Sequence, residues 1–201
     1  MQGIAAQNVA PGETVFDRFV AFFHEHVALE EVAPASVPAL SPFAALAALC
    51  LRLREKPKPL SYLESHAGRA VYDLASPEAE KTGEAKAGIL RLIAEGAVPP
   101  DHPLATAIRL TEQAYGTGFY PGSPMIAAQL LGPEDVLHLM ELHPQEHAAL
   151  KRAMRGRNVH IHRRDGYEGL LALSPPTPRR GLVLIDPSYE VKTEYLQVAD
   201  V

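Results

Sequence analysis

The sequence predicts an α/β fold in which helices cover both faces of a parallel sheet. Short apolar stretches alternate with stretches of helical periodicity along residues 56–201, the pattern of repeated strand and helix units. The stretch from Leu182 to Ile185, preceded by Gly181, is apolar throughout, which is typical of a strand covered on both sides. An acid ends or closely follows each predicted strand. We therefore expect a doubly wound sheet with a ligand site at the carboxyl ends of its strands.

Length and composition fit one globular domain with a small insertion. The 201 residues, 47% of them hydrophobic, are enough to bury a substantial core. No apolar run approaches the roughly 18 residues of a membrane span, and acids at Glu13 and Asp17 are unlike a secretory signal. The single cysteine, Cys50, lies among Ala and Leu residues, so we interpret it as a small core residue in a reducing compartment. These features predict a cytoplasmic protein with no membrane contact.

Residues 1–55 are predicted to form an N-terminal helical region. A helix with a broad apolar stripe is expected at 14–31, and the prolines Pro34, Pro38 and Pro42 then indicate an extended linker. A second helix, expected at 43–54, is rich in Ala and Leu, which predicts that it is buried on most sides.

Residues 56–201 are predicted to hold the sheet. Strands are expected at 60–63, 136–142, 158–162 and 182–185, and helices at 125–131, 144–155 and about 167–173. Two more helices, at 76–96 and 103–115, fall between the first and second strands. A single crossover connection between two parallel strands needs fewer helices, so we expect a small helical insertion at about 76–118. Ser123 is expected to cap the helix that follows it.

The acids at the strand ends are Glu64, Glu141, Asp165 and Asp186. Taken singly, each is more often a surface charge or a helix cap. In a doubly wound sheet, all four strand ends lie along one edge. An acid after the second strand can accept hydrogen bonds from both ribose hydroxyls, and one after the third can accept from an adenine amino group. Their recurrence favours a ligand that contains a nucleoside.

The last of these acids begins the corner Asp186-Pro187-Ser188-Tyr189. This corner offers a carboxylate, a carbonyl beside a residue that lacks an N–H, and an aromatic ring that can stack. Together these groups suit a flat base that carries an amino group.

Positive charge gathers between Lys151 and Arg180, although the net charge of the chain is −5. Eight cations and two acids lie in this segment, so 8 − 2 = +6. A solvated face and a phosphate-binding patch both remain open as interpretations. The arginines of the second interpretation are Arg155, Arg157, Arg163, Arg164, Arg179 and Arg180. No metal site is expected, because His160 and His162 alternate along a strand and no third ligand follows at a typical spacing.

Several blocks of the sequence resemble one protein family. They lie at 62–68, 80–84, 120–124, 141–144, 164–166 and 179–190, and Tyr120-Pro121-Gly122-Ser123-Pro124 is the most specific of them. In these blocks the chain resembles the RlmJ family of bacterial 23S ribosomal RNA adenine-N6 methyltransferases, over about residues 56–197.

The resemblance implies a Rossmann-like enzyme that uses S-adenosylmethionine (AdoMet), with a helical insertion after the first strand. It implies that Asp186, the Pro187 carbonyl and Tyr189 receive the target adenine of 23S ribosomal RNA. It assigns the cofactor to a further set of residues, namely Glu64, His66, Gly68, Ser123, Glu141 and Asp165.

The chain also departs from the family pattern. Ser188 stands where the family has a second proline, and family members continue for further strands beyond the position of Val201. We therefore expect a fragment of a longer protein, or a fourth strand whose open edge is covered by another chain. Two functions remain open at this point: an rRNA methyltransferase, and a non-catalytic relative that acts as an RNA-binding or protein-interaction module.

Overall fold

The computed structural model describes residues 42–76, 98–156 and 158–187. These ranges lie in one compact unit, Ala39–Pro187. The helix predicted at 14–31 lies outside the described residues, as does the helix predicted at 76–96 except for its first residue. Arg157, Ser188 and Tyr189 also lie outside them. The division of the chain between residues 55 and 56 stays a prediction.

Four parallel strands form the main sheet. They are β1 (Ser61–Glu64), β4 (Val136–Met140), β5 (Val159–His162) and β6 (Gly181–Leu184), in the order β5-β4-β1-β6. The first strand of the sheet is central, and Leu63 lies opposite His138 on one side and Val183 on the other. Numbered along the chain within this sheet, the order is 3-2-1-4, that of the first four strands of a doubly wound sheet. The predicted α/β fold with four parallel strands is confirmed.

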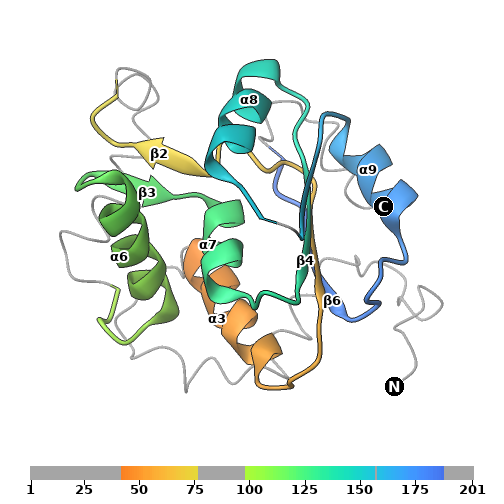
Figure 1. Cartoon of the computed structure of the whole chain (residues 1–201), viewed down its shortest axis with the longest axis horizontal. Coiled ribbons are helices and arrows are strands. Elements are labelled where there is room, and N and C mark those ends of the chain that lie inside the picture. The colour runs from red at the N-terminus through yellow and green to blue at the C-terminus, as the bar shows by residue number, and fades with distance from the viewer. Residues whose placement is uncertain (1–41, 77–97, 157, 188–201) are drawn as a thin grey trace, which may run out of the picture. The chain divides into compact units, whose positions relative to one another are not determined.

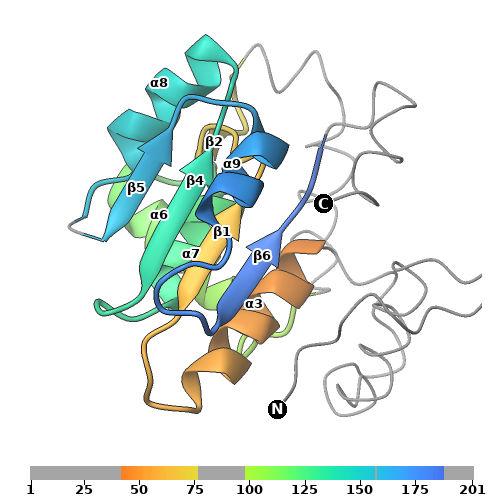
Figure 2. The same ribbon diagram turned by 90° about the vertical axis from the view of Figure 1, so that its right-hand side faces the viewer.

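Helices cover both faces of this sheet, as Figures 1 and 2 show. They are α3 (Pro42–Arg54), α6 (Pro103–Tyr115), α7 (Ser123–Leu130), α8 (Pro144–Ala153) and α9 (Gly166–Leu173). Of the helices in the described ranges, only α9 lies on the second face (Figure 2). Proline begins α6 and α8, where its missing N–H leaves no helical hydrogen bond unmade. Among the helices of the described ranges there is no candidate for a membrane span.

The larger part of the core lies between the sheet and the helices of the first face. Tyr62, Ile126 and Leu139 are fully buried there. Cys50 of α3 belongs to the same cluster, and burial is the main reason that the pKa of its thiol rises to about 12. Such a thiol is unreactive near neutral pH, so the prediction of a core cysteine is confirmed. A smaller cluster of Leu63, Met140 and Leu170 lies under α9.

A short two-stranded ribbon, which the sequence did not predict, flanks the main sheet. It pairs β2 (Val71–Asp73) with β3 (Phe119–Pro121) in antiparallel orientation, and α6 lies between the two strands along the chain. A helical insertion after β1 is therefore present. The ribbon continues into a hydrogen bond from the Gly122 N–H to the Ala70 carbonyl, 2.7 Å long. It thus brings the start of α7 to the loop that follows β1.

The strand β6 is less covered than predicted. Leu182 and Leu184 pack against the main core, but Gly181 is exposed and Val183 is 48% exposed. Within the described residues α9 is the only helix on that face, and it packs on Leu63 and Met140 rather than on Val183. The apolar run therefore predicted the strand correctly and its burial on both faces wrongly.

The close approach of β6 to β1 requires a glycine at the first position of β6. A Cβ atom at Gly181 would lie 2.0 Å from the carbonyl oxygen of Ser61. We expect Gly181→Ala to lower the free energy of unfolding by about 1–3 kcal/mol in urea titration, because the backbones must separate. Gly132→Ala is the control, since its nearest atom is Asp135 Oδ2 at 3.4 Å. Equal stability of the two variants would contradict this account of the β1–β6 contact.

Candidate active site at the carboxyl ends of the strands

All four predicted acids lie at the carboxyl ends of parallel strands. Glu64 is the last residue of β1, Glu141 follows β4, Asp165 precedes α9, and Asp186 follows β6. Since the strands run parallel, these ends share one edge of the sheet. Both Asp186 and Glu141 raise the pKa of Glu64, so the three carboxyl groups interact electrostatically.

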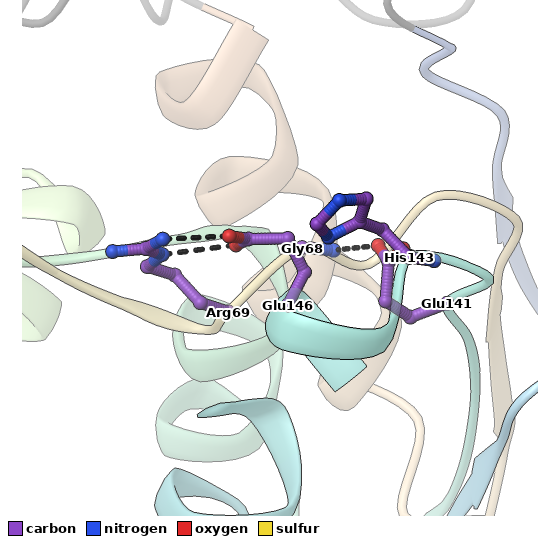
Figure 3. Close-up of polar contacts among 5 residues, drawn as sticks. All are labelled: Gly68, Arg69, Glu141, His143 and Glu146. Atoms are coloured by element: carbon purple, nitrogen blue, oxygen red, sulfur yellow. Dashed lines mark hydrogen bonds and ion pairs between the residues drawn. The ribbon is translucent and has the colours of Figure 1, made fainter. Parts of the chain in front are cut away.

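The carboxylate of Glu141 joins two loops (Figure 3). Its Oε2 accepts a hydrogen bond of 2.8 Å from the Gly68 N–H, in the loop after β1. Its Oε1 accepts one of 2.7 Å from the N–H of His143, the residue before α8. A carboxylate has about four acceptor positions, so two remain for a ligand. Gly68 has a φ of +61°, a left-handed conformation that glycine adopts without steric cost.

Glu64 is fully buried and does not face solvent. The Tyr62 hydroxyl donates to its Oε2 at 2.8 Å, and the Ser123 hydroxyl donates to its Oε1. Burial is the largest cause that raises the pKa of Glu64, to about 8; the two hydroxyls lower it, while Asp186 and Glu141 raise it. No ion pair in the described part of the chain includes Glu64. The carboxyl is therefore largely protonated near neutral pH.

The role predicted for Ser123 as a helix cap is wrong. Gly122 is the N-cap of α7, and no side chain caps that end. Ser123 instead donates its hydroxyl to Glu64, on a strand 59 positions earlier in the chain. This bond uses the hydroxyl proton, which leaves the oxygen able to accept a hydrogen bond from a ligand.

Asp165 is the cap of α9. Its Oδ1 accepts a hydrogen bond of 3.0 Å from the Glu168 N–H. The next residue, Gly166, lies so close to the loop after β1 that a Cβ atom would be 2.2 Å from the Ser65 carbonyl oxygen. The loops after β1 and β5 are therefore in contact, and the second oxygen of Asp165 remains as an acceptor for a ligand.

His66 and Asp186 lie near each other at the same edge. The Nδ1 atom of His66 lies 2.7 Å from the Ser65 hydroxyl oxygen. The His66 ring packs edge-on against the ring of Tyr167, with ring centroids 5.3 Å apart. Desolvation is the main cause that raises the pKa of Asp186, and His66 opposes it. Asp186 is exposed, so solvent screens its interaction with these charges. Pro187 is buried.

The predicted basic patch is divided between two edges of the sheet. Arg163 and Arg164 follow β5, at the edge that carries the acids, whereas Arg155 precedes β5 at the opposite edge. Arg179 and Arg180 precede β6 and lie at that opposite edge too. Arg180 donates to the backbone carbonyls of Lys58, at 2.9 Å, and Leu53. Its guanidinium therefore ties the end of α3 to the start of β6.

Sequence reasoning missed a cluster of histidines on the sheet face that carries α9. His138 stacks on His160 and His162, with ring centroids 5.0 and 5.7 Å apart. Burial lowers the pKa of His138 and of His162, and the neighbouring histidines add to this effect. Within the described ranges, no group of three or more His, Cys, Asp or Glu residues is arranged to hold a metal ion. On β4, His138 lies between two leucines, Leu137 and Leu139, and this alternation was the signal that could have identified it.

Two charged residues beside Glu141 were also missed. Arg69 and Glu146 form an ion pair that joins the loop after β1 to the first turn of α8 (Figure 3). No pattern in the sequence pairs them, since they are 77 positions apart.

Known proteins resemble this chain in sequence and in structure. The family model described as Ribosomal RNA large subunit methyltransferase D, RlmJ, matches residues 57–201. Ribosomal RNA large subunit methyltransferase J of Escherichia coli is 41% identical over 150 residues, 73% of this chain and 53% of that protein. The protein of the same name from Haemophilus influenzae is 40% identical over 148 residues, 71% and 52% of the two chains. The chain spans about half the length of these curated relatives.

A solved structure shares the fold. The crystal structure of protein LPL1258 from Legionella pneumophila superposes with a TM-score of 0.66 and 39% sequence identity. The match covers 78% of this chain and 58% of that one.

The buried carboxyl of Glu64 makes stability depend on pH. Its pKa is about 8 in the folded protein against an ordinary value of 4.5, so between these values the folded state binds more protons than the unfolded state. The contribution of Glu64 is therefore complete below pH 4.5 and is lost as pH rises toward 8. We expect Glu64→Gln to gain stability relative to the wild type between about pH 5 and pH 9 in urea unfolding, because each pKa unit corresponds to about 1.4 kcal/mol.

Glu134→Gln is the control for this comparison, because Glu134 is exposed and precedes β4 at the opposite edge. Its pH profile is expected to follow that of the wild type. Parallel profiles for Glu64→Gln and the wild type would show that Glu64 titrates normally and would contradict its burial as a neutral group.

Proposed function

We propose that this chain transfers a methyl group from AdoMet to the N6 amino group of an adenine in 23S ribosomal RNA. The chain belongs to the RlmJ family of ribosomal RNA large subunit methyltransferases. The observation that carries the proposal is the acid-lined carboxyl edge, where the Glu141 carboxylate is held between the Gly68 and His143 N–H groups. The proposal implies a cytoplasmic location, with ribosomal RNA as the partner.

The residues at this edge fit a cationic nucleoside cofactor. Glu141 keeps acceptor positions for the ribose hydroxyls, and the second oxygen of Asp165 suits the adenine amino group. Ser123, as an acceptor, suits the ammonium of the methionine half. His66, Gly68 and Glu64 complete the set assigned to the cofactor. When bound, AdoMet supplies an electrophilic methyl group on a positively charged sulfur, and acids around the edge favour that charge.

The chain's own groups would prepare the target amine. The lone pair of an adenine amino group is delocalised into the ring, so the nitrogen must become more tetrahedral before it can attack. Asp186 would accept one N–H and the Pro187 carbonyl the other, which favours that geometry, while Tyr189 would stack on the extruded base. The raised pKa of Asp186 makes it a better acceptor for the proton that the amine loses.

A second candidate function is a non-catalytic module that binds RNA or another protein. One observation favours it: Val183 on β6 is 48% exposed, so an apolar side chain of this strand is available to a partner. This candidate predicts binding of ribosomal RNA or of a protein partner without methyl transfer.

Methyl transfer from radiolabelled AdoMet to unmethylated 23S ribosomal RNA tests the two candidates. We expect Asp186→Asn to lower kcat by about 100-fold or more, because it removes a charged acceptor at the reacting nitrogen. The dissociation constant for AdoMet, measured by calorimetry, is expected to stay within about threefold of the wild type, since Asp186 faces the amine.

Glu134→Gln serves as a matched control and should leave both quantities unchanged. No binding of AdoMet by the wild type at millimolar concentration would contradict the enzymatic proposal. Full activity in Asp186→Asn would contradict the role given to this carboxylate.

A further inference from the structure

The loop between β1 and β2 adopts a conformation that its own sequence does not favour. Gly68 and Ala70 both have left-handed φ angles, +61° and +67°. Glycine adopts this conformation freely, but the Cβ atom of Ala70 makes it unfavourable there. Such backbone persists only where surrounding contacts hold it.

Backbone groups of Ala67, Gly68 and Ala70 help to hold this loop. The Ala67 N–H donates to the Met140 carbonyl at 2.9 Å, and the Ala70 carbonyl accepts from the Gly122 N–H at 2.7 Å. Between them, the Gly68 N–H donates to Glu141. Of the three, only the contact of Gly68 reaches a side chain that the proposed function assigns to the cofactor.

Arg69 adds a further contact through its side chain (Figure 3). Its Nε donates to Glu146 Oε2 at 2.9 Å, and its Nη2 donates to Glu146 Oε1 at 2.6 Å. This geometry is the two-point pairing that guanidinium and carboxylate favour. The hydrogen bond from Arg69 is the main reason that the pKa of Glu146 is lowered. The Arg69 guanidinium also lies 5.9 Å from the ring centre of Tyr72.

The ion pair and the Glu141 contacts connect the same two segments of chain. Gly68 and Arg69 are neighbours in one segment, while Glu141, His143 and Glu146 lie within one short stretch of the other. Glu146 is in the first turn of α8, where the helix dipole also favours its negative charge. The ion pair and the Glu141 contacts therefore hold the same two segments together.

We propose that Arg69 and Glu146 are positioning residues for the cofactor, which hold the Glu141 carboxylate in the orientation that binds ribose. The inference rests on the proposed function and adds to it two residues that do not touch the cofactor. The side chains are 31% and 25% exposed and lie outside the buried clusters. Removing either side chain leaves no cavity in those clusters, so it should alter binding more than folding.

Calorimetry with AdoMet on the whole chain tests this inference. Arg69→Ala and Glu146→Gln are each expected to weaken binding about tenfold and to raise KM for AdoMet, while kcat stays within about twofold. Arg69→Lys keeps the charge without the two-point geometry and should lose less. The exchanged pair, Arg69→Glu with Glu146→Arg, should recover part of the affinity.

A second measurement, on the protein without cofactor, separates positioning from general damage. Hydrogen exchange at the Gly68 amide is expected to be about tenfold faster in Arg69→Ala, whereas the thermal midpoint changes by only a few degrees. Arg52→Ala is the matched control, because it removes the exposed Arg52–Glu55 pair of α3. It should change neither affinity nor exchange.

A variant series in the Glu141→Ala background decides whether the pair acts through Glu141. There, Arg69→Ala should have no further effect on AdoMet binding. An equal loss in both backgrounds, or unchanged affinity in Arg69→Ala and Glu146→Gln, would overturn the inference and leave the proposed function standing. Absence of AdoMet binding by the wild type would overturn both. If Arg69→Ala does not fold, Glu146→Gln decides the outcome by the same criteria.

Discussion

The carboxylate of Glu141, held between the Gly68 and His143 N–H groups, is the contact on which the candidate site depends. Parallel strands bring their carboxyl ends to one edge, but they do not determine how the loops beyond those ends lie. Here one side chain connects the loop after β1 to the start of α8, and it does so with its ligand-facing acceptors still available. The left-handed backbone at Gly68 and Ala70 is compatible with the fold because contacts of this kind hold it.

Crowding of negative charge is the second constraint at this edge. Glu64 is buried beside Tyr62 and Ser123, and the nearby Asp186 and Glu141 make its ionisation less favourable still. An edge of this kind is better satisfied by a cation than by an anion. The arginines that precede β6 do not supply a cation to this edge, since they lie at the opposite edge, where Arg180 is engaged with backbone carbonyls.

Local patterns predicted the strands and the acids at their ends, because the spacing of apolar residues and the presence of turn residues can be recognised within a few positions of the sequence. Features that depend on distant partners were not predictable. The hydroxyl of Ser123 bonds to Glu64 rather than capping its own helix, and Arg69 pairs with Glu146 across 77 positions. Strands β2 and β3 have three residues each, too few for a periodic signal. The exposure of Val183 depends on which helices cover the second face, which the apolar run itself does not specify.

A crystal structure of the chain with S-adenosylhomocysteine, the product form of the cofactor, tests the central claim most directly. The account predicts the ribose hydroxyls against the free acceptor positions of Glu141, the adenine amino group against Asp165, and the ammonium within hydrogen-bond distance of the Ser123 oxygen. Gly68 and His143 should keep their contacts with Glu141. A ligand bound elsewhere, or a bound state in which Glu141 turns away from both N–H groups, would contradict it.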